Sequence, residues 1–218
     1  MEWKTEIHQY LGFDQLEAVQ EDRRQWVKAN PEKGFMLIAE PLPTFTHGVS
    51  AKPEDCLWDS ETLLNEKVEC VPVSRGGQWT YHGPGQIVIY PLIQLSAAGY
   101  PNRGVKEYVS DLRNSVVRYL KSIDIIVETP DSKPFGIYHE GRKLVSMGIH
   151  IRDGISSHGI ALYHSGDQTS YFKGIRACGV TNESFVTLTE LGVEHSWLDC
   201  ASQLAEELKR GFQLRKNC

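Results

Sequence analysis

The spacing of apolar residues near the start of the chain predicts a helix and then a strand. Apolar residues that recur at helical spacing are Phe13, Leu16, Val19, Trp26 and Val27. Pro31 and Gly34 end this helical pattern. The apolar run at 35–40, FMLIAE, predicts a buried strand. The two prolines in the run at 41–48, PLPTFTHG, predict an extended loop after that strand.

The middle of the chain alternates between strand-like and helical patterns. The runs at 69–74 (ECVPVS) and 86–93 (QIVIYPLI) predict strands, so we expect the glycine-rich stretch at 75–86 to be a loop that joins them. An amphipathic helix is predicted by a stripe of apolar residues with charges between them, namely Val105, Tyr108, Val109, Leu112, Val116, Tyr119 and Leu120. The run at 123–128, IDIIVE, predicts a further strand.

Two turn signals divide the segment 135–162 into a meander of three antiparallel strands. The signals are HEGR at 139–142 and RDGI at 152–155. A last helix is predicted by apolar residues at helical spacing near the C-terminus, which are Leu198, Ala201, Leu204, Ala205 and Leu208.

A two-residue turn at 153–154 would give the second hairpin of this meander one face of very small side chains. It would place Gly148 opposite Gly159 and Ser146 opposite Ala161. The other face would carry larger apolar side chains, which are Val145, Met147, Ile149, Ile160 and Leu162. Either a ligand occupies the space above the small face or a helix packs closely against it, and the pattern alone does not choose between them.

Composition and charge narrow the class of protein. A chain of 218 residues with 40% apolar content can bury one good core, so we expect one domain. The net charge of -5 gives no overall attraction to nucleic acid. No basic and apolar signal peptide precedes the first helix and no window reaches about 18 apolar residues, so we expect a cytoplasmic protein that does not enter a membrane.

The cysteines and histidines indicate neither a disulfide framework nor a metal site. The five cysteines are irregularly spaced: Cys56, Cys70, Cys178, Cys200 and Cys218. An odd number at such spacings argues for free thiols, one of which could be reactive. The eight histidines show no H-E-x-x-H or C-x-x-C arrangement, so no bound metal is expected.

The glycine-rich stretch RGGQWTYHGPGQ at 75–86 does not match a nucleotide-binding loop. A phosphate loop needs a lysine and a hydroxyl residue that lead into a helix, and a dinucleotide fingerprint also needs a following helix, whereas this stretch leads into a strand. Its glycines allow close backbone approach and expose N–H groups beside Tyr81 and His82. Polar side chains clustered in a rigid loop are typical of a functional site.

Three stretches together resemble the octanoyltransferases that begin lipoate synthesis, within the biotin/lipoate protein ligase superfamily. They are RGGQWTYHGPGQIVIYPL, RKLVSMGIHIRDGISSHGIAL, and ACGV followed by TLTELG, with PTFTHGVSAKPED preceding them. The resemblance implies an α+β fold, a single domain over 1–218 with a mixed, largely antiparallel central sheet flanked by helices. The chain departs from the family pattern at Ala177, where proline is usual, and at Tyr163, where asparagine is usual.

By position, the resemblance implies a nucleophile at Cys178 and a partner lysine at Lys143. It also implies substrate-binding residues, which are Arg75, Gly76, Gly77, Gln78, Trp79, Thr80, Tyr81, His82, Ser146, Met147, Gly148, Gly159, Ile160 and Ala161. An acyl chain that lies across Gly148 and Gly159 would explain the absence of side chains there. His158 is a possible auxiliary residue, and His158 and His82 either polarise the thioester carbonyl or only hydrogen-bond the loop.

Strand alternation places Lys143 on the face of Val145 and Met147, opposite the small face. A bulge or a strand end must therefore bring Lys143 to Cys178. At the end of an apolar row, this lysine would be suited to act as a base toward the thiol of Cys178 and later toward an incoming amine.

The implied reaction transfers an octanoyl group from octanoyl-acyl carrier protein, through a thioester on Cys178, to a lysine of apo lipoyl domains. This is the first step of endogenous protein lipoylation, and its acceptors would be the 2-oxoacid dehydrogenase complexes and the glycine cleavage H protein. No ATP, metal or other cofactor is expected, and neither is oligomerisation. An ATP-dependent lipoate or biotin ligase and a non-catalytic module that binds lipoyl domains remain as alternatives.

Overall fold

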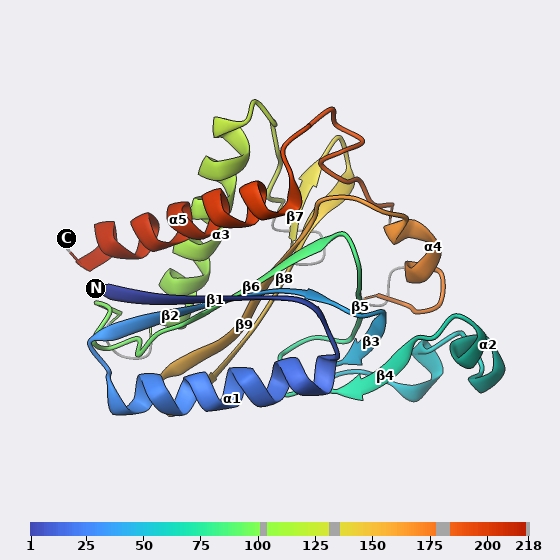
Figure 1. The fold of residues 1–218 in the computed structure, drawn as a ribbon, viewed down its shortest axis with the longest axis horizontal. Coiled ribbons are helices and arrows are strands. Elements are labelled where there is room, and N and C mark those ends of the chain that lie inside the picture. Colours follow the sequence, from blue (N-terminus) through green and yellow to red (C-terminus); the bar gives the residue numbers. More distant parts are fainter. Residues whose placement is uncertain (101–103, 131–135, 178–183, 217–218) are drawn as a thin grey trace.

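The computed structural model describes residues 1–100, 104–130, 136–177 and 184–216, drawn as a ribbon in Figure 1. Six strands form the main sheet in the order β1-β2-β6-β9-β8-β7. Their bounds are β1 (Glu2–Leu11), β2 (Lys33–Pro41), β6 (Gln86–Leu92), β7 (Gly136–His139), β8 (Arg142–Arg152) and β9 (Ile155–Tyr163). Among the described strands of this main sheet, only β1 and β2 pair in parallel, so the mixed, largely antiparallel sheet is confirmed.

A smaller sheet of three strands lies toward one end of the main sheet (Figure 1). Its order is β4-β3-β5, with bounds β3 (Thr44–His47), β4 (Glu69–Pro72) and β5 (Trp79–His82). β3 pairs in parallel with β4 and antiparallel with β5. The aromatic residues Phe45, Trp79 and Tyr81 of this sheet belong to a separate apolar cluster with Phe172 and Phe185.

Helices cover both faces of the main sheet (Figure 1). The long helices are α1 (Phe13–Ala29), α3 (Val105–Ser122) and α5 (Trp197–Lys216). The short ones are α2 (Ser60–Asn65), α4 (Gln168–Phe172) and the 3-10 turn η1 (Pro53–Asp55). α1 packs on one face, and α3 and α5 pack together on the other. Within the described ranges, no helix combines the length and apolarity that crossing a membrane requires.

Burial on both faces explains why β6 reads as an unbroken apolar run. Ile87 and Ile89 point into the core beneath α3 and α5, while Val88, Tyr90 and Leu92 point into the core beneath α1. Every residue of β6 is buried. A strand with helices on both sides shows no alternation of apolar and polar residues, and the α+β architecture expected from the sequence is confirmed.

Most of the predicted elements are present, and one predicted strand is wrong. The first helix, the strand that follows it, the amphipathic helix, the three-stranded meander and the C-terminal helix all form. The run at 123–128 is not a strand. Ile123 is the cap residue of α3, and Asp124 has a φ of 61°, a left-handed conformation outside the β region. Only Glu128 forms a bridge, with Tyr138.

Three short or exposed strands were not predicted. β1 is an edge strand whose exposed and half-buried residues give a weak pattern. β3 lies inside the stretch 41–48 that the prolines mark as a loop. β5 lies inside the glycine-rich stretch 75–86, which is therefore not simply a loop between two strands of one sheet. It leads from β4 in the small sheet, through β5, to β6 in the main sheet.

Candidate active site

The β8–β9 hairpin forms one wall of the candidate site. Asp153 and Gly154 have φ values of 55° and 76°, which is the positive pair that a two-residue type I′ turn requires. The register pairs Gly148 with Gly159, and Ser146 with Ala161, so the predicted register is confirmed.

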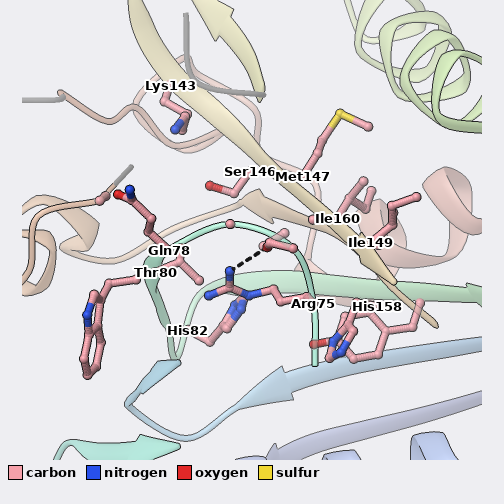
Figure 2. A pocket seen from close by; sticks show the side chains of 18 of the residues that line it. Arg75, Gln78, Thr80, His82, Lys143, Ser146, Met147, Ile149, His158 and Ile160 are labelled. Atoms are coloured by element: carbon pink, nitrogen blue, oxygen red, sulfur yellow. Dashed lines mark hydrogen bonds between the residues drawn. The ribbon is translucent and has the colours of Figure 1, made fainter. Parts of the chain in front are cut away.

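A pocket with a volume of about 290 Å³ lies between this hairpin and the segment that contains β5 (Figure 2). The sequence-predicted residues that line it are Arg75, Gly76, Gly77, Gln78, Trp79, Thr80, His82, Lys143, Ser146, Met147, Gly148, His158, Gly159, Ile160 and Ala161. Four lining residues were not predicted: Tyr90, Ile149, Phe172 and Ala177. Strand alternation could have indicated Tyr90, because it follows Val88 on the α1 face of β6.

Tyr81 is the one described residue of the predicted set that does not line the pocket. Its ring lies on the other face of β5 and stacks on Tyr171, with the ring centroids 4.4 Å apart. Gly83 accommodates the hydroxyl of Tyr81, because a Cβ at Gly83 would lie 1.9 Å from that oxygen. Tyr81 therefore packs in the small aromatic core instead of contacting a bound molecule.

Gly148 and Gly159 are both small, but for different reasons. A Cβ on Gly148 would lie 3.3 Å from Cδ of Arg75, so the arginine side chain occupies the space above it. A Cβ on Gly159 would lie 2.3 Å from the backbone oxygen of Ile89 and 2.9 Å from Cδ of Pro91. Gly159 thus permits the close approach of β6. No helix packs on these glycines, and a larger residue at 159 would collide with a strand before it narrowed the pocket.

A β-bulge brings Lys143 to the pocket. In the β7–β8 ladder Ile137 pairs with Val145 but Tyr138 pairs with Lys143, so Leu144 is an extra residue. Leu144 and Val145 both enter the main core as a result. The alternation beyond them is reversed, and the side chain of Lys143 is 3% exposed and lines the pocket. The bulge that strand alternation required is therefore present.

Cys178 lies outside the described residues, but the residues on either side of its segment are anchored at the pocket. Ala177 lines the pocket and forms a parallel bridge with Trp79. At 184 the chain returns to β8, where the backbone N–H of Lys143 donates to the oxygen of Ser184 at 2.8 Å. The predicted contact between Lys143 and Cys178 stays a prediction.

The pocket has two chemically different ends. We call Lys143, Ser146 and Ala177 the lysine end, and Tyr90, Ile149 and His158 the histidine end. Figure 2 shows Lys143 and Ser146 on one side of the pocket and Ile149 and His158 on the other. At the lysine end the hydroxyl groups of Ser146 and Tyr163 are 2.6 Å apart, so Tyr163, which departs from the family pattern, supports the pocket wall.

Arg75 holds the glycine-rich segment against β3. Its Nη2 donates to the backbone oxygen of Thr46 at 3.0 Å and to Oγ1 of Thr46 at 2.9 Å, and its Nη1 donates to the oxygen of Gly76 at 3.1 Å. The backbone N–H of Gly48 donates to the oxygen of Gln78. The guanidinium group of Arg75 and the backbone near it are therefore fixed in the pocket wall between the two ends.

Two buried glutamines fix which nitrogen of His82 carries hydrogen. Both amide hydrogens of Gln168 are donated to backbone carbonyls, at 3.2 and 2.7 Å, so its oxygen must accept from Gln86, at 2.8 Å. The other amide hydrogen of Gln86 goes to the oxygen of Tyr81. The Gln86 oxygen therefore faces Nδ1 of His82 at 3.1 Å, and Nδ1 is the donor.

Both pocket histidines are neutral near pH 7. Burial, and secondly the Arg75 guanidinium, lowers the pKa of His82 to about 3. The same two causes, in the same order, lower the pKa of His158 to about 3. Because the hydrogen of neutral His82 is on Nδ1 and bound to Gln86, its Nε2 has none to donate to a carbonyl. For His82 the geometry therefore favours hydrogen bonding of the loop over polarisation of a thioester.

Glu17 of α1 is a half-buried acid behind the histidine end that sequence patterns did not indicate. Its Oε1 lies 3.7 Å from Nδ1 of His158, and burial raises its pKa to about 7, against the opposing effect of Arg75. Gln20, one turn further, accepts from the backbone N–H of His158 at 2.6 Å, which holds that residue at a φ of 54°. The only sequence signal for Glu17 was its helical position at the edge of the apolar stripe.

Among the residues that the structure describes, no group of three or more His, Cys, Asp or Glu side chains is placed to hold a metal ion. The pocket lining itself carries two cations, Arg75 and Lys143, and two neutral histidines. The pocket therefore has a lysine at one end and a neutral histidine at the other.

Comparison with known proteins agrees with this geometry. A family described as "Lipoyl protein ligase A/B catalytic domain" matches residues 15–209. The octanoyltransferase of Shewanella piezotolerans is 33% identical over 208 residues, which cover 94% of this chain and 89% of that protein. The octanoyltransferase of Caldanaerobacter subterraneus is 31% identical over 189 residues, which cover 87% and 81%.

Solved structures share the fold at low sequence identity. A lipoate-protein ligase A bound with ATP matches with a TM-score of 0.75 and 14% identity, over 99% of this chain and 85% of the other. The biotin protein ligase of Aquifex aeolicus in complex with biotin and ATP matches with a TM-score of 0.59 and 14% identity, over 100% and 72%. At these identities the likeness concerns the fold alone.

Proposed function

Because the chain belongs to the lipoyl protein ligase A/B catalytic domain family, we propose that it transfers an octanoyl group from acyl carrier protein to a lysine of apo lipoyl domains. Its similarity to curated octanoyltransferases makes it an acyltransferase of protein lipoylation. Acyl carrier protein as donor and a thioester on Cys178 as intermediate are our proposal for how it acts.

One observation carries the proposed mechanism: a buried lysine lies where the chain on both sides of Cys178 meets the pocket. Ala177 is a pocket residue, and Ser184 is hydrogen-bonded to the backbone of Lys143. A thiol has a reference pKa of about 8.5 and needs a base or a cation to react at neutral pH. We assign that role to Lys143.

The size and lining of the pocket suit an octanoyl chain. The pocket has a volume of about 290 Å³, and its hairpin wall includes the small residues Gly148, Gly159 and Ala161. We place the thioester at the lysine end and the tail toward the histidine end, where the burial of each methylene contributes about 0.8 kcal/mol.

In the first half-step Sγ of Cys178 attacks the thioester carbonyl on the phosphopantetheine arm. Lys143 takes the thiol proton and returns it to the pantetheine sulfur as the C–S bond breaks. In the second, the amine of the acceptor lysine attacks the enzyme thioester, a C–N bond forms, and Lys143 passes the amine proton to the departing sulfur of Cys178. The donor thioester already stores the free energy needed to form an amide, so no ATP is required.

The proposed acceptors are the lipoyl domains of 2-oxoacid dehydrogenase complexes and the glycine cleavage H protein. A related archaeal system has been described with a bi-partite lipoate protein ligase and its E2 lipoyl domain, and it shares the fold with a TM-score of 0.68 at 13% identity, over 99% of this chain and 84% of that one. The proposed transfer requires the acceptor's lysine side chain to enter the lysine end of the pocket, and a lipoyl domain is an acceptor of that kind.

An ATP-free transfer assay tests this function. The protein is incubated with octanoyl-acyl carrier protein and an apo lipoyl domain, with and without ATP, and the lipoyl domain is analysed by mass spectrometry. We expect one octanoyl amide per domain at equal rates in both samples. Transfer that appears only with ATP would identify a ligase, and tight binding of the lipoyl domain without any transfer would identify a non-catalytic module.

A further inference from the structure

Gln78 carries a buried polar atom that has no hydrogen-bond partner among the described residues. Its side-chain oxygen Oε1 is buried and has no hydrogen-bond partner. Leaving such an atom unpaired costs about 1–3 kcal/mol, so native proteins keep few of them, and those they keep often have a role in binding or catalysis. Gln86 and Gln168, in contrast, use their amide groups fully.

The backbone around Gln78 is held, so the unpaired oxygen is not a feature of a loose loop. The backbone oxygen of Gln78 accepts from the N–H of Gly48 at 3.1 Å. Its neighbour Trp79 donates from Nε1 to the oxygen of Lys52 at 2.8 Å and bridges to Ala177. A small shift of the chain to find a partner for Oε1 would break these contacts.

Gln78 lines the pocket on the side of the lysine end. Figure 2 shows its amide and the Lys143 side chain on the same side, away from His158 and Ile149. No described aspartate or glutamate lines the pocket, so an incoming amine meets few acceptors for its hydrogens. The Ser146 hydroxyl is already paired with that of Tyr163.

We propose that Oε1 of Gln78 accepts a hydrogen bond from the attacking amine in the second half-step. This inference rests on the proposed function. A neutral amine has two hydrogens: one passes to Lys143 as the C–N bond forms, and the other is bound by Gln78, which turns the nitrogen lone pair toward the thioester carbon. A thiol nucleophile has a single hydrogen, which passes to Lys143, and it leaves Gln78 without a partner.

The proposal predicts that Gln78 distinguishes amine from thiol acceptors. Gln78→Met keeps the length of the side chain and removes the oxygen. From an isolated octanoyl-enzyme, discharge to an apo lipoyl domain should slow about tenfold, the effect of one hydrogen bond of about 1.4 kcal/mol. Discharge to N-acetylcysteamine, a small thiol, should stay within a factor of two, as should loading from octanoyl-acyl carrier protein.

A stability measurement separates this role from a structural one. Because Gln78→Met removes an unpaired buried oxygen, its urea midpoint should rise, whereas loss of a structural hydrogen bond would lower it. Gln203→Met is the matched control, because it makes the same substitution at an exposed position of α5 outside the pocket lining, and it should leave the ratio of amine to thiol discharge unchanged.

Equal slowing of amine and thiol discharge in Gln78→Met, or an equal change of the ratio in Gln203→Met, would overturn the assignment to Gln78. An unloaded wild-type protein would instead overturn the proposed function, because loading precedes the step in which Gln78 acts.

Discussion

Both ends of the pocket contain ionisable side chains, but only the lysine end includes Ala177, the neighbour of Cys178 in the sequence. The lysine end has the buried side chain of Lys143, next to Ala177, which precedes Cys178 in the chain. The histidine end has two titratable groups, His158 and Glu17, whose pKa values are shifted so that neither charge is favoured. The difference teaches that polar residues alone do not mark the reacting end, since burial can make them suitable neighbours for an apolar tail.

Replacing Lys143 tests the assignment of the chemistry to the lysine end. Lys143→Ala should slow both half-steps by about 10²–10⁴-fold, because both require removal of a proton from the attacking group. Single-turnover loading and discharge measure the two steps separately, and raising the pH should recover part of the rate. Lys121→Ala, on the exposed surface of α3, is the control. A Lys143 variant that keeps normal rates at neutral pH would place the base elsewhere.

The two glycines between the ends should respond very differently to an added methyl group. Gly159→Ala would place a Cβ 2.3 Å from the Ile89 oxygen and should destabilise the protein by about 3 kcal/mol. Gly148→Ala meets only the arginine side chain at 3.3 Å and should cost less than about 1 kcal/mol. Urea unfolding of the two variants provides the comparison. Equal stability would mean that β6 does not approach Gly159 as described.

The neutral state of the histidine end has a consequence for stability against pH. The pKa of Glu17 is about 7 in the folded state and 4.5 in the unfolded state, so the folded state binds this proton more tightly. The contribution of the bound proton to the free energy of unfolding is therefore lost as the pH rises from about 4.5 to 7. Glu17→Gln removes the loss. Between pH 4 and pH 8, the free energy of unfolding of Glu17→Gln should rise relative to that of the wild type by on the order of 2 kcal/mol, allowing for the partial exposure of Glu17.

Urea unfolding at several pH values measures this difference, with Glu61→Gln as the exposed control. The titration of His82 and His158 affects both proteins alike and cancels in the comparison. A difference that does not change with pH would show that Glu17 ionises normally and that the histidine end is charged.

Arg75 contributes less than burial to the neutrality of the two histidines. Arg75→Met removes a positive charge that disfavours the imidazolium form, so the pKa values of His82 and His158 should both rise. Because burial is the larger cause, both should stay below the ordinary value of 6.5. NMR titration of the imidazole signals checks this, and a fall in either pKa would contradict the placement of Arg75 beside the histidines.

Sequence patterns predicted the hairpin wall of the site well, for a clear physical reason. Strand alternation and the Asp153-Gly154 turn allow a single register, so the pairing of Gly148 with Gly159 could be predicted from the residues alone. A bulge was expected because strand alternation alone places Lys143 on the wrong face of β8. Its location at Leu144 could not be predicted from the pattern, because it depends on how β8 pairs with β7.

Sequence patterns predicted the opposite wall less well, because its structure depends on contacts between distant segments. The glycines around β5 obscure its strand pattern in the sequence, and β5 forms because it pairs with β3. The tautomer of His82 depends on Gln86 and Gln168, which lie 82 residues apart. The same limit applies to Gly159, whose small size suggested space for a ligand, although the close backbone of β6 requires it.

The most direct test of the account is the location of the acyl group. The protein is incubated with octanoyl-acyl carrier protein without ATP or acceptor, quenched in acid, digested and analysed by peptide mass spectrometry. The account predicts one octanoyl group on the peptide that contains Cys178, removable by hydroxylamine and absent from Cys178→Ala. Acylation at any other residue, or acylation that persists in Cys178→Ala, would contradict it.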